Sequence, residues 1–263
     1  MDCSKYIIYT DVDGTAIHSY KPLSYLNKKA IKEFIENGGM FGVASGRTRR
    51  SIDEIFPMIN MPYVEANGTL ISDNDGTIIF KSLLYKDFKQ SLYDYVKERK
   101  EPMLTALGNE TTKVILNDER DERILDFRRK LISYEEYMNL DIVKASIIAP
   151  EEDINKAIEE LKTLNFMNSV TGSRSSKMYY EMYNHDADKG LGIKKAIEYR
   201  KLNDRTLVCI GDVENDLNML KMADIALCPA NAIDEVKEIC IKVLPDARHN
   251  TIYHALKYLR CNH

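Results

Sequence analysis

The stretch Asp11-Val12-Asp13-Gly14-Thr15 decides the fold, because it directly follows the apolar run Tyr6-Ile7-Ile8-Tyr9. It therefore delivers two carboxylates to the end of a buried strand, which is where parallel α/β sheets bind their ligands. Side chains alternate along a strand, so Asp11 and Asp13 share one face, and Gly14 lets the chain turn sharply after them. One carboxylate can then act as a nucleophile while the other transfers protons.

The same sequence pattern occurs a second time, as Asp73-Asn74-Asp75-Gly76-Thr77, between two short apolar runs. Asn, Asp and Gly adopt the backbone conformations that a tight β-connection needs, so we interpret this second copy as a hairpin turn. A calcium-binding EF-hand loop is excluded for the first copy. Such a loop requires Gly at its sixth position and Glu at its twelfth, where this chain has Ala16 and Pro22.

Composition limits the class of protein. A chain of 263 residues suffices for one α/β domain or for a core with an inserted second domain. A net charge of −4 gives no general attraction for nucleic acid or anionic membranes, and no apolar run is long enough to span a bilayer. The five cysteines are odd in number and contain no C-x-x-C pair, which argues against a disulfide framework or a structural zinc site. We therefore expect a cytoplasmic protein without nucleic-acid or membrane partners.

The first third of the chain alternates between strand and helix patterns. Residues 5–10 predict a buried strand, residues 26–35 one face of a helix, and residues 40–44 a second strand, followed by a helix and a short strand near residue 63. Such alternation favours a parallel sheet with helices on both faces. Asp11 and Ser45 then both lie at the carboxyl ends of strands.

A different pattern begins near residue 85. We predict a helix to residue 99, strands near 104 and at 114–116, a charged helix at 118–131, a strand at 142–148, a helix at 151–164 and a strand at 178–183. This is an α+β unit inserted into the first one. The predicted fold is a Rossmann-like doubly wound α/β core, residues 1–84 and 185–263, with an inserted α+β cap, residues 85–184.

The last third resumes the strand and helix alternation. We predict a helix from residue 189, a strand at 206–210, a helix through 217–220, a strand at 225–227 and a final helix from 251. The first of these strands ends in Gly211-Asp212, and Asp216 follows four residues later in the first turn of a helix. A third strand end therefore carries carboxylates to the same edge of the sheet.

Carboxylates from three strand ends repel one another in a single crevice unless a cation lies between them. Mg²⁺ is the natural cation, because it takes carboxylate, carbonyl and water oxygens and completes its shell with substrate phosphate. Lys189 suits such a site, since an ammonium group can neutralise a nucleophilic carboxylate and hold a phosphoryl oxygen. The cluster predicts phosphoryl chemistry.

Each of these residues also has a purely structural interpretation when it is taken alone. Lys189 could be a solvated helix residue, Ser45 a turn former or helix cap, and Asp212 with Asp216 the cap and first-turn acid of a helix. Their order in the chain and their placement at strand ends favour a common site.

With these residues in place, the chain resembles the haloacid dehalogenase superfamily over nearly its whole length, in particular its Cof-type sugar-phosphatase-like branch. Asp11-Val12-Asp13-Gly14-Thr15 matches the first motif and Ala44-Ser45-Gly46-Arg47 the second. Asp188-Lys189-Gly190 matches the third motif, and Gly211-Asp212 with Asn215-Asp216 the fourth. The first and fourth motifs are specific, whereas the second and third are short.

The resemblance implies a role for each matched residue. Asp11 is implied as the nucleophile that forms an aspartyl-phosphate, and Asp13 as the acid that protonates the leaving group and then activates water. Mg²⁺ is implied to bind Asp11, the backbone carbonyl of Asp13, and Asp212, with Asp216 organising its hydration shell. The residues implied to hold the phosphoryl group are Ser45, Gly46, Lys189 and Asn215.

Two positions depart from the family pattern. Ala16 stands where a larger aliphatic residue is usual, and Cys228-Pro229 replaces a more typical Met-Gly pair. Neither change removes a chemical group, so both concern local packing. His18 and His185 lie near motif positions without an assigned role.

The leading hypothesis is a magnesium-dependent phosphatase that acts on a small phosphorylated metabolite, such as a sugar phosphate. A phosphoglycomutase-like transferase and a catalytically silent phosphometabolite-binding protein are the alternatives. The sequence is compatible with a monomer or a homodimer.

Overall fold

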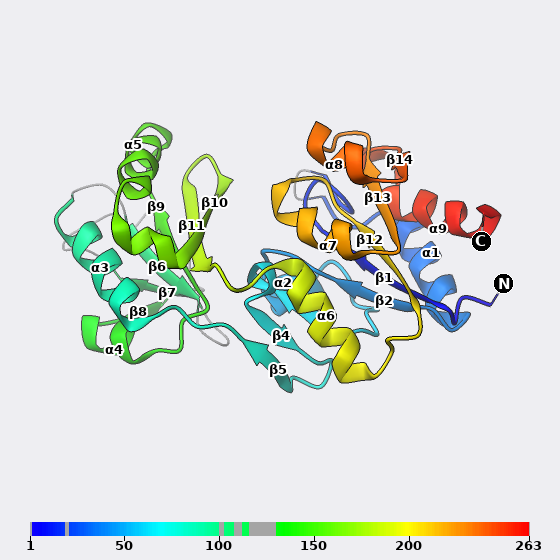
Figure 1. Cartoon of the computed structure of the whole chain (residues 1–263), viewed down its shortest axis with the longest axis horizontal. Helices are drawn as coiled ribbons and strands as arrows, with labels where there is room; N and C mark the ends of the chain where they lie inside the picture. Colours follow the sequence, from blue (N-terminus) through cyan, green and yellow to red (C-terminus); the bar gives the residue numbers. More distant parts are fainter. Residues whose placement is uncertain (1, 19–20, 100–102, 108–111, 116–129, 263) are drawn as a thin grey trace. The chain divides into compact units, whose positions relative to one another are not determined.

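The computed structural model of the chain describes residues 2–18, 21–99, 103–107, 112–115 and 130–262 (Figure 1). The chain divides into two compact units. One, which we call the core unit, consists of Met1–Phe80 and Asp188–His263, and the other, the inserted unit, of Lys81–Ala187. The predicted cap, residues 85–184, falls within the inserted unit.

The core unit is built on a parallel sheet with the strand order β14-β13-β12-β1-β2. The strands are β1 (Tyr6–Thr10), β2 (Met40–Val43), β12 (Thr206–Ile210), β13 (Ile225–Pro229) and β14 (Lys242–Leu244). Strand β1 pairs with β12 on one side and with β2 on the other, and all of its residues are buried. A strand buried on both faces needs apolar side chains throughout, which explains its continuous apolar run.

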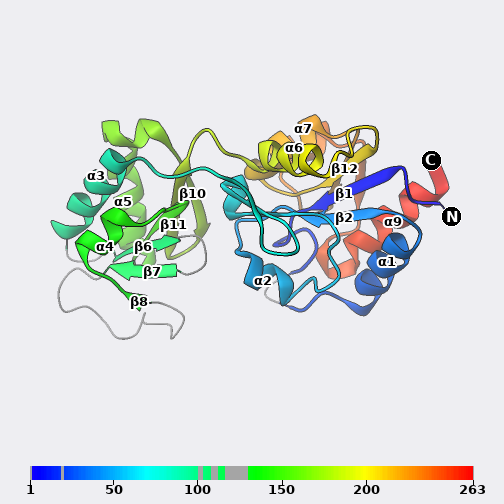
Figure 2. The same ribbon diagram turned by 90° about the horizontal axis from the view of Figure 1, so that it is seen from below.

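Helices cover both faces of this sheet (Figure 2). One face packs against α1 (Tyr25–Glu36), α2 (Arg49–Asp53) and α9 (Thr251–Asn262), and the other against α6 (Lys189–Arg200), α7 (Leu217–Met222) and α8 (Asp234–Ile239). Alternate residues of β1 contribute to the two cores, with Ile8 in the first and Ile7 in the second. The predicted doubly wound fold is confirmed.

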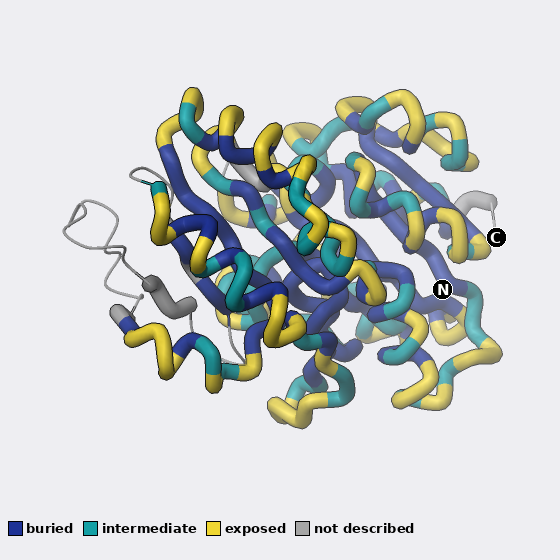
Figure 3. The backbone as a smooth tube through the Cα atoms, turned by 60° about the vertical axis from the view of Figure 1, so that its left-hand side comes forward, coloured by how far each residue is buried: buried dark blue, intermediate teal, exposed yellow. Residues whose placement is uncertain are grey.

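Burial follows this layered arrangement. The central strands β1, β12 and β13 are buried along most of their length, and Figure 3 shows helices on which buried and exposed residues alternate. In α1, for example, Ala30, Ile31 and Phe34 are buried at helical spacing while the residues between them are polar. No helix among the described residues has the length and apolar character that are needed to cross a membrane.

A small three-stranded sheet also belongs to the core unit. Its strands are β3 (Tyr63–Glu65), β4 (Leu70–Ser72) and β5 (Ile78–Lys81), in that order. The second Asp-x-Asp-Gly-Thr copy connects β4 to β5, and the amide of Asp73 donates to the carbonyl of Thr77 over 2.8 Å. This copy is therefore a hairpin turn, as predicted. Arg49 on α2 holds it by donating to the carbonyl of Asp73 over 2.8 Å.

The inserted unit contains, among its described residues, a sheet with the strand order β10-β11-β9-β6-β7-β8. The strands are β6 (Met103–Leu107), β7 (Thr112–Ile115), β8 (Lys130–Leu131), β9 (Lys144–Ile148), β10 (Val170–Ser176) and β11 (Tyr179–Asn184). The helices α3 (Lys86–Lys97), α4 (Tyr134–Asn139) and α5 (Glu151–Lys162) share one apolar core with this sheet. The unit is α+β, as expected.

The predictions for this unit differ from the structure in three places. Most of the charged helix expected at 118–131 lies outside the described residues, and its last two residues form strand β8 instead of a helical turn. Strand β10 was not predicted, because Gly, Ser, Thr and Arg dominate its sequence. Helix α4 was also not predicted, since its six residues are too few for a clear helical period.

Candidate active site

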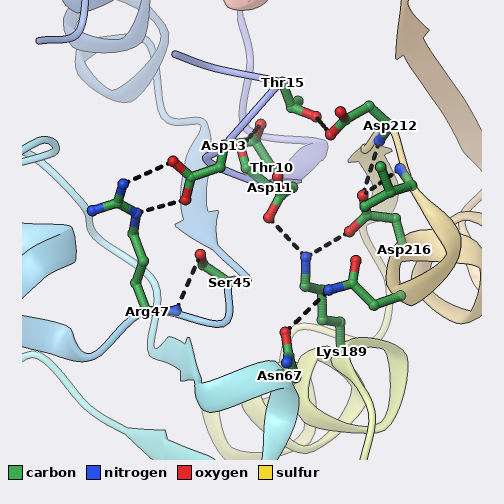
Figure 4. Close-up of polar contacts among 12 residues, drawn as sticks. Thr10, Asp11, Asp13, Thr15, Ser45, Arg47, Asn67, Lys189, Asp212 and Asp216 are labelled. Atoms are coloured by element: carbon green, nitrogen blue, oxygen red, sulfur yellow. Dashed lines mark hydrogen bonds and ion pairs between the residues drawn. The ribbon is translucent and has the colours of Figure 1, made fainter. Parts of the chain in front are cut away.

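Two adjacent strands carry the first and fourth motifs to one edge of the core sheet (Figure 4). The amide of Asp11 donates to the carbonyl of Ile210 over 2.8 Å, which continues the pairing of β1 and β12 by one residue. Asp11 and Gly211 therefore leave the sheet side by side. Asp11 and Asp212 are both only 5% exposed.

Gly14 allows the loop after β1 to fold against Asp212. Its φ is +86°, and a Cβ atom at this position would lie 2.2 Å from Oδ2 of Asp212. Only glycine combines this backbone conformation with so close an approach. The next residue, Thr15, then donates from Oγ1 to Oδ1 of Asp212 over 2.6 Å. The Gly-Thr part of the first motif thus positions a carboxylate of the fourth.

Lys189 lies at the centre of the site. Asp188 caps helix α6 by accepting from the amide of Leu191 over 2.9 Å, so the helix begins at Lys189. The Lys189 side chain is 1% exposed, and Nζ lies 2.7 Å from Oδ1 of Asp11 and 2.7 Å from Oδ1 of Asp216. The interpretation of Lys189 as a solvated helix residue is therefore wrong.

Asp216 links the two sides of the fourth motif. Its Oδ2 accepts hydrogen bonds from the amides of Asp212, over 2.8 Å, and Val213, over 3.2 Å. Its Oδ1 accepts from Lys189, and the side chain is fully buried. Asp216 thus fixes the backbone conformation that presents Asp212.

The carboxylates of Asp11, Asp212 and Asp216 offer a set of oxygens that lie within 4.8 Å of one another. All three residues are buried, and Lys189 supplies a single positive charge against their three negative charges. A second cation would balance this excess, and an all-oxygen donor set suits a hard ion such as Mg²⁺. The residues present therefore fit the predicted metal.

Burial and mutual interactions shift the pKa values in this cluster. Burial, together with the charges of Asp216 and Asp212, raises the pKa of Asp11, although Lys189 opposes the shift. Burial also raises the pKa of Asp212 to about 6, against the hydrogen bond from Thr15. For Lys189, burial lowers the pKa, but the Asp11 and Asp216 carboxylates outweigh it and the net shift is upward. The charged form of Lys189 is therefore strongly favoured.

The second motif follows β2 and is tied to the loop after β3. Ser45 is 2% exposed, its amide donates to the carbonyl of Val64, and its carbonyl accepts from the amide of Asn67. The Asn67 side chain accepts from Nδ2 of Asn215 over 3.2 Å. A Cβ on Gly46 would lie 3.1 Å from Oδ1 of the same asparagine. Asn67 therefore connects the second and fourth motifs.

Asp13 does not join the carboxylate cluster. Its side chain is 53% exposed and points toward Arg47, whose Nε and Nη2 donate to the two carboxylate oxygens over 2.6 and 2.7 Å (Figure 4). Sequence reasoning did not assign a role to Arg47. Its position directly after Ser45-Gly46 was the available signal, but nothing in the sequence relates it to a residue 34 positions earlier.

The structure also describes the other residues that the sequence analysis singled out. Ala16 is buried, at 2% exposure, and Cys228 is fully buried in β13, so both departures from the family pattern are packing positions. His18 is exposed. His185 belongs to the inserted unit, where its Nδ1 lies 3.0 Å from the carbonyl oxygen of Ser169.

The family is shown by comparison with known proteins. The model of the haloacid dehalogenase-like hydrolases matches residues 8–256, which is most of the chain. The chain therefore belongs to the haloacid dehalogenase-like hydrolases. Together with the phosphatases among its relatives, this membership identifies it as a phosphatase enzyme.

Individual relatives cover the chain almost completely. The 5-amino-6-(5-phospho-D-ribitylamino)uracil phosphatase YcsE of Bacillus subtilis is 25% identical over 241 residues, covering 88% of this chain and 86% of the relative. The structure of a HAD/COF-like hydrolase from Plasmodium vivax has a TM-score of 0.82 and 25% identity, with coverage of 97% and 95%. The HAD subclass IIB sugar phosphatase BT4131 has the same fold, with a TM-score of 0.78 and 18% identity over 97% of this chain and 98% of that one.

Proposed function

We propose that the enzyme is a magnesium-dependent phosphatase that hydrolyses a small phosphorylated metabolite through an aspartyl-phosphate at Asp11. The observation that carries this proposal is the buried ammonium group of Lys189, 2.7 Å from both Asp11 and Asp216. The ammonium group opposes the rise in the pKa of Asp11 that burial causes, and its hydrogen bond orients the carboxylate, so it favours the state that a nucleophile requires. The nearby acidic cluster supports a metal that a phosphoryl group would help to bind.

In the first proposed step, an oxygen of Asp11 attacks the phosphorus atom and the ester oxygen leaves. Asp13 transfers a proton to that oxygen, so the leaving group departs as an alcohol. In the second step Asp13 accepts a proton from water, and the resulting hydroxide attacks the phosphorus atom. The bond to Asp11 breaks, and inorganic phosphate and the free carboxylate are formed.

The remaining site residues bind and orient the phosphoryl group. Ser45 is held by hydrogen bonds to Val64 in β3 and to Asn67 after it, and Asn215 by its contact with Asn67. We assign Ser45, Gly46, Lys189 and Asn215 to the phosphoryl oxygens. Donors that are fixed before the reaction stabilise charge in the transition state without reorganising.

We assign Mg²⁺ to Asp11, the backbone carbonyl of Asp13, and Asp212, with Asp216 in support. When bound, the ion neutralises charge on the phosphoryl oxygens. Asp216 holds the amide of Asp212 and so fixes the direction of the Asp212 carboxylate. Thr15 restrains the same carboxylate through its hydroxyl.

A sugar phosphate or a related phosphorylated polyol is the proposed class of substrate, because a phosphoribityl compound is the substrate in the name of one relative and sugar phosphatase is the name of another. We assign substrate selection to the predicted cap, residues 85–184. Cys3, Cys209, Cys228 and Cys240 are free thiols, which supports the cytoplasmic location inferred from composition.

The test is phosphate release from a panel of sugar phosphates, nucleotides and cofactor phosphates, with Mg²⁺ and with a chelator. Asp11→Asn removes the proposed nucleophile, and Asp73→Asn is the matched control in the second copy of the motif. We expect magnesium-dependent turnover that Asp11→Asn abolishes and Asp73→Asn retains. Acid quenching of the wild-type enzyme with a ³²P-labelled substrate should also trap label on the protein.

Two outcomes would contradict this proposal. Equal loss in both variants would show that Asp11 has no special role. Binding of phosphorylated metabolites without release of phosphate would favour the transferase or the catalytically silent protein.

A further inference from the structure

Among the residues that the structure describes, Arg47 supplies the side-chain hydrogen bonds to the Asp13 carboxylate. Nε of Arg47 donates to Oδ2 over 2.6 Å, and Nη2 donates to Oδ1 over 2.7 Å. These are two parallel hydrogen bonds from a planar donor to a planar acceptor. Such a bidentate pair restricts the rotation of the carboxylate as well as its position.

Arg47 is itself fixed at both ends. Its Nη1 donates to Oγ of Ser51 on α2 over 2.8 Å, so all three nitrogens of the guanidinium group are engaged. At the backbone, its carbonyl accepts from the amide of Ala66 over 3.1 Å, and its amide donates to Oγ of Ser45 over 3.3 Å. The arginine therefore connects Asp13 to a rigid part of the core unit.

Asp13 needs such a constraint. Its side chain is 53% exposed, and it lies between the end of β1 and the positive-φ residue Gly14, outside any helix or strand. An exposed carboxylate without a partner would sample several rotamers. Proton transfer, however, requires the donor and acceptor atoms to lie about 2.6–3.2 Å apart.

We propose that Arg47 is a positioning residue that fixes the Asp13 carboxyl group for proton transfer to the leaving group. Each carboxyl oxygen has two acceptor positions, so an oxygen that accepts from Arg47 keeps a second position for the transferred proton. The inference rests on the proposed function, because it concerns the protonation of an ester oxygen. It adds a residue outside the set assigned to the phosphoryl group and the metal.

A different role for Arg47 would be direct binding of the substrate phosphoryl group. The two roles predict different dependence on the leaving group. An alkyl phosphate releases a strongly basic alkoxide, which requires protonation by Asp13, whereas p-nitrophenyl phosphate releases a weakly basic phenolate, which does not. Loss of positioning affects the first substrate, while loss of phosphoryl binding affects both.

The experiment compares kcat/KM for glycerol 1-phosphate and p-nitrophenyl phosphate, because kcat/KM includes every step up to departure of the leaving group. Arg47→Lys keeps the charge but removes the bidentate geometry. We expect its kcat/KM to fall by about 100-fold or more for the alkyl ester and by less than about five-fold for the nitrophenyl ester. Arg50→Lys is the control, because Arg50 lies three residues after Arg47, on α2, with a side chain that is 76% exposed, and both of its rates should match the wild type.

A double variant tests whether Arg47 acts through Asp13. In an Asp13→Asn background the alkyl ester should already be slow, and adding Arg47→Lys should change the ratio of the two rates by less than about two-fold. Melting temperatures of all variants should lie close to that of the wild type, because a half-exposed ion pair contributes little to stability.

Equal falls for the two esters in Arg47→Lys, with an active wild-type enzyme, would overturn this inference alone. A further fall in the ratio of kcat/KM for the alkyl ester to kcat/KM for the nitrophenyl ester, on adding Arg47→Lys to Asp13→Asn, would also overturn the inference. Arg47 would then act independently of Asp13. A wild-type enzyme that hydrolyses neither these esters nor any other phosphate ester would instead overturn the proposed function, and this inference with it.

Discussion

The ammonium nitrogen of Lys189 lies 2.7 Å from Oδ1 of Asp11, although the two side chains are only 1% and 7% exposed. A buried charge is tolerated only when it is paired and hydrogen-bonded. The two residues are 178 positions apart in the chain, so this contact exists only in the folded core unit. The proposed catalytic arrangement and the stability of the core are therefore coupled through Lys189.

This coupling predicts the effect of Lys189→Met. The substitution keeps an apolar side chain of similar length but leaves the Asp11 and Asp216 carboxylates without their cation. We expect the free energy of unfolding of the metal-free enzyme at neutral pH to fall by about 3–5 kcal/mol, as measured by urea denaturation. Phosphatase activity should be lost as well.

Lys194→Met is the matched control, because Lys194 is exposed on the same helix. Its unfolding free energy should stay within about 0.5 kcal/mol of the wild type. Added Mg²⁺ should stabilise Lys189→Met more than the wild type, since the ion then meets an uncompensated acidic cluster. A similar loss in both lysine variants would contradict the interpretation.

The two Asp-x-Asp-Gly-Thr copies provide a test of why Gly14 is required. Gly14 and Gly76 both have positive φ, at +86° and +94°, so alanine is strained at either position. A Cβ at residue 14 would in addition lie 2.2 Å from Oδ2 of Asp212, whereas at residue 76 the nearest atom is Nη1 of Arg49 at 3.8 Å. Backbone strain is thus common to both sites, and the clash is specific to Gly14.

We therefore expect Gly76→Ala to lower the free energy of unfolding by about 1–2 kcal/mol and Gly14→Ala by about 3 kcal/mol or more. Only Gly14→Ala should also weaken Mg²⁺ binding, because its Cβ displaces Asp212. Calorimetric melting with and without Mg²⁺ measures both effects. Unchanged Mg²⁺ binding in Gly14→Ala would show that Asp212 is not a ligand.

Much of this arrangement could be predicted from the sequence, because it depends on periodicity and on strand ends. Apolar runs of four residues identified β1 and β12, and the topology of a parallel sheet then placed Asp11 and Asp212 at one edge. The hairpin interpretation of the second motif copy followed from the apolar runs on either side of it. These features are local, and local patterns specify them.

Side-chain directions beyond the strand ends could not be predicted in the same way. Asp11 and Asp13 are two residues apart, yet one faces Lys189 and the other faces Arg47, because the chain leaves the strand between them. Asp216, expected to organise the hydration shell of the metal, belongs with Asp11 and Asp212 to one cluster whose carboxylate oxygens lie within 4.8 Å of one another. Such geometry depends on turns and long-range contacts that no local pattern specifies.

The pKa of Asp212 predicts how Mg²⁺ binding depends on pH. Burial raises this pKa from its ordinary value of 3.8 to about 6, so the metal-free folded protein holds the proton more tightly than the unfolded chain. At low pH the proton bound to Asp212 therefore stabilises the metal-free folded protein. This stabilisation is lost as the pH rises from about 4 to 6. Mg²⁺ requires the ionised carboxylate, so the increase in melting temperature on adding Mg²⁺ should be small near pH 5 and grow as the pH rises through about 6.

Thermal melting across this pH range, with and without Mg²⁺, measures the effect. The upward shift in the pKa of Asp11 acts in the same direction. Asp212→Asn is the control, and it should remove most of the Mg²⁺ effect at every pH. A constant Mg²⁺ effect from pH 5 to 8 would exclude Asp212 as the group that competes with the metal for a proton.

Glu65 at the end of β3 links the hairpin sheet to the loop that carries the second motif. The carboxylate is 4% exposed, accepts from the amide of Arg49 over 2.5 Å and accepts from Oγ of Ser72 over 2.6 Å. Arg49 is the first residue of α2 and lies two positions after Arg47. Glu65 therefore supplies the acceptor that helix α2 needs at its first turn, since the preceding Thr48 makes no side-chain cap.

Glu65→Ala should leave the Arg49 amide and the Ser72 hydroxyl without their buried acceptor, which we expect to cost about 1–3 kcal/mol of unfolding free energy. Glu65→Gln should cost much less, because its amide oxygen can accept from Arg49 while its NH₂ group donates to Ser72. If the helix start also holds Arg47 in place, Glu65→Ala should slow an alkyl phosphate more than p-nitrophenyl phosphate, and Glu65→Gln should restore the wild-type ratio. Urea denaturation and kcat/KM for the two esters measure these effects, and equal stability of the alanine and glutamine variants would show that neither hydrogen bond contributes.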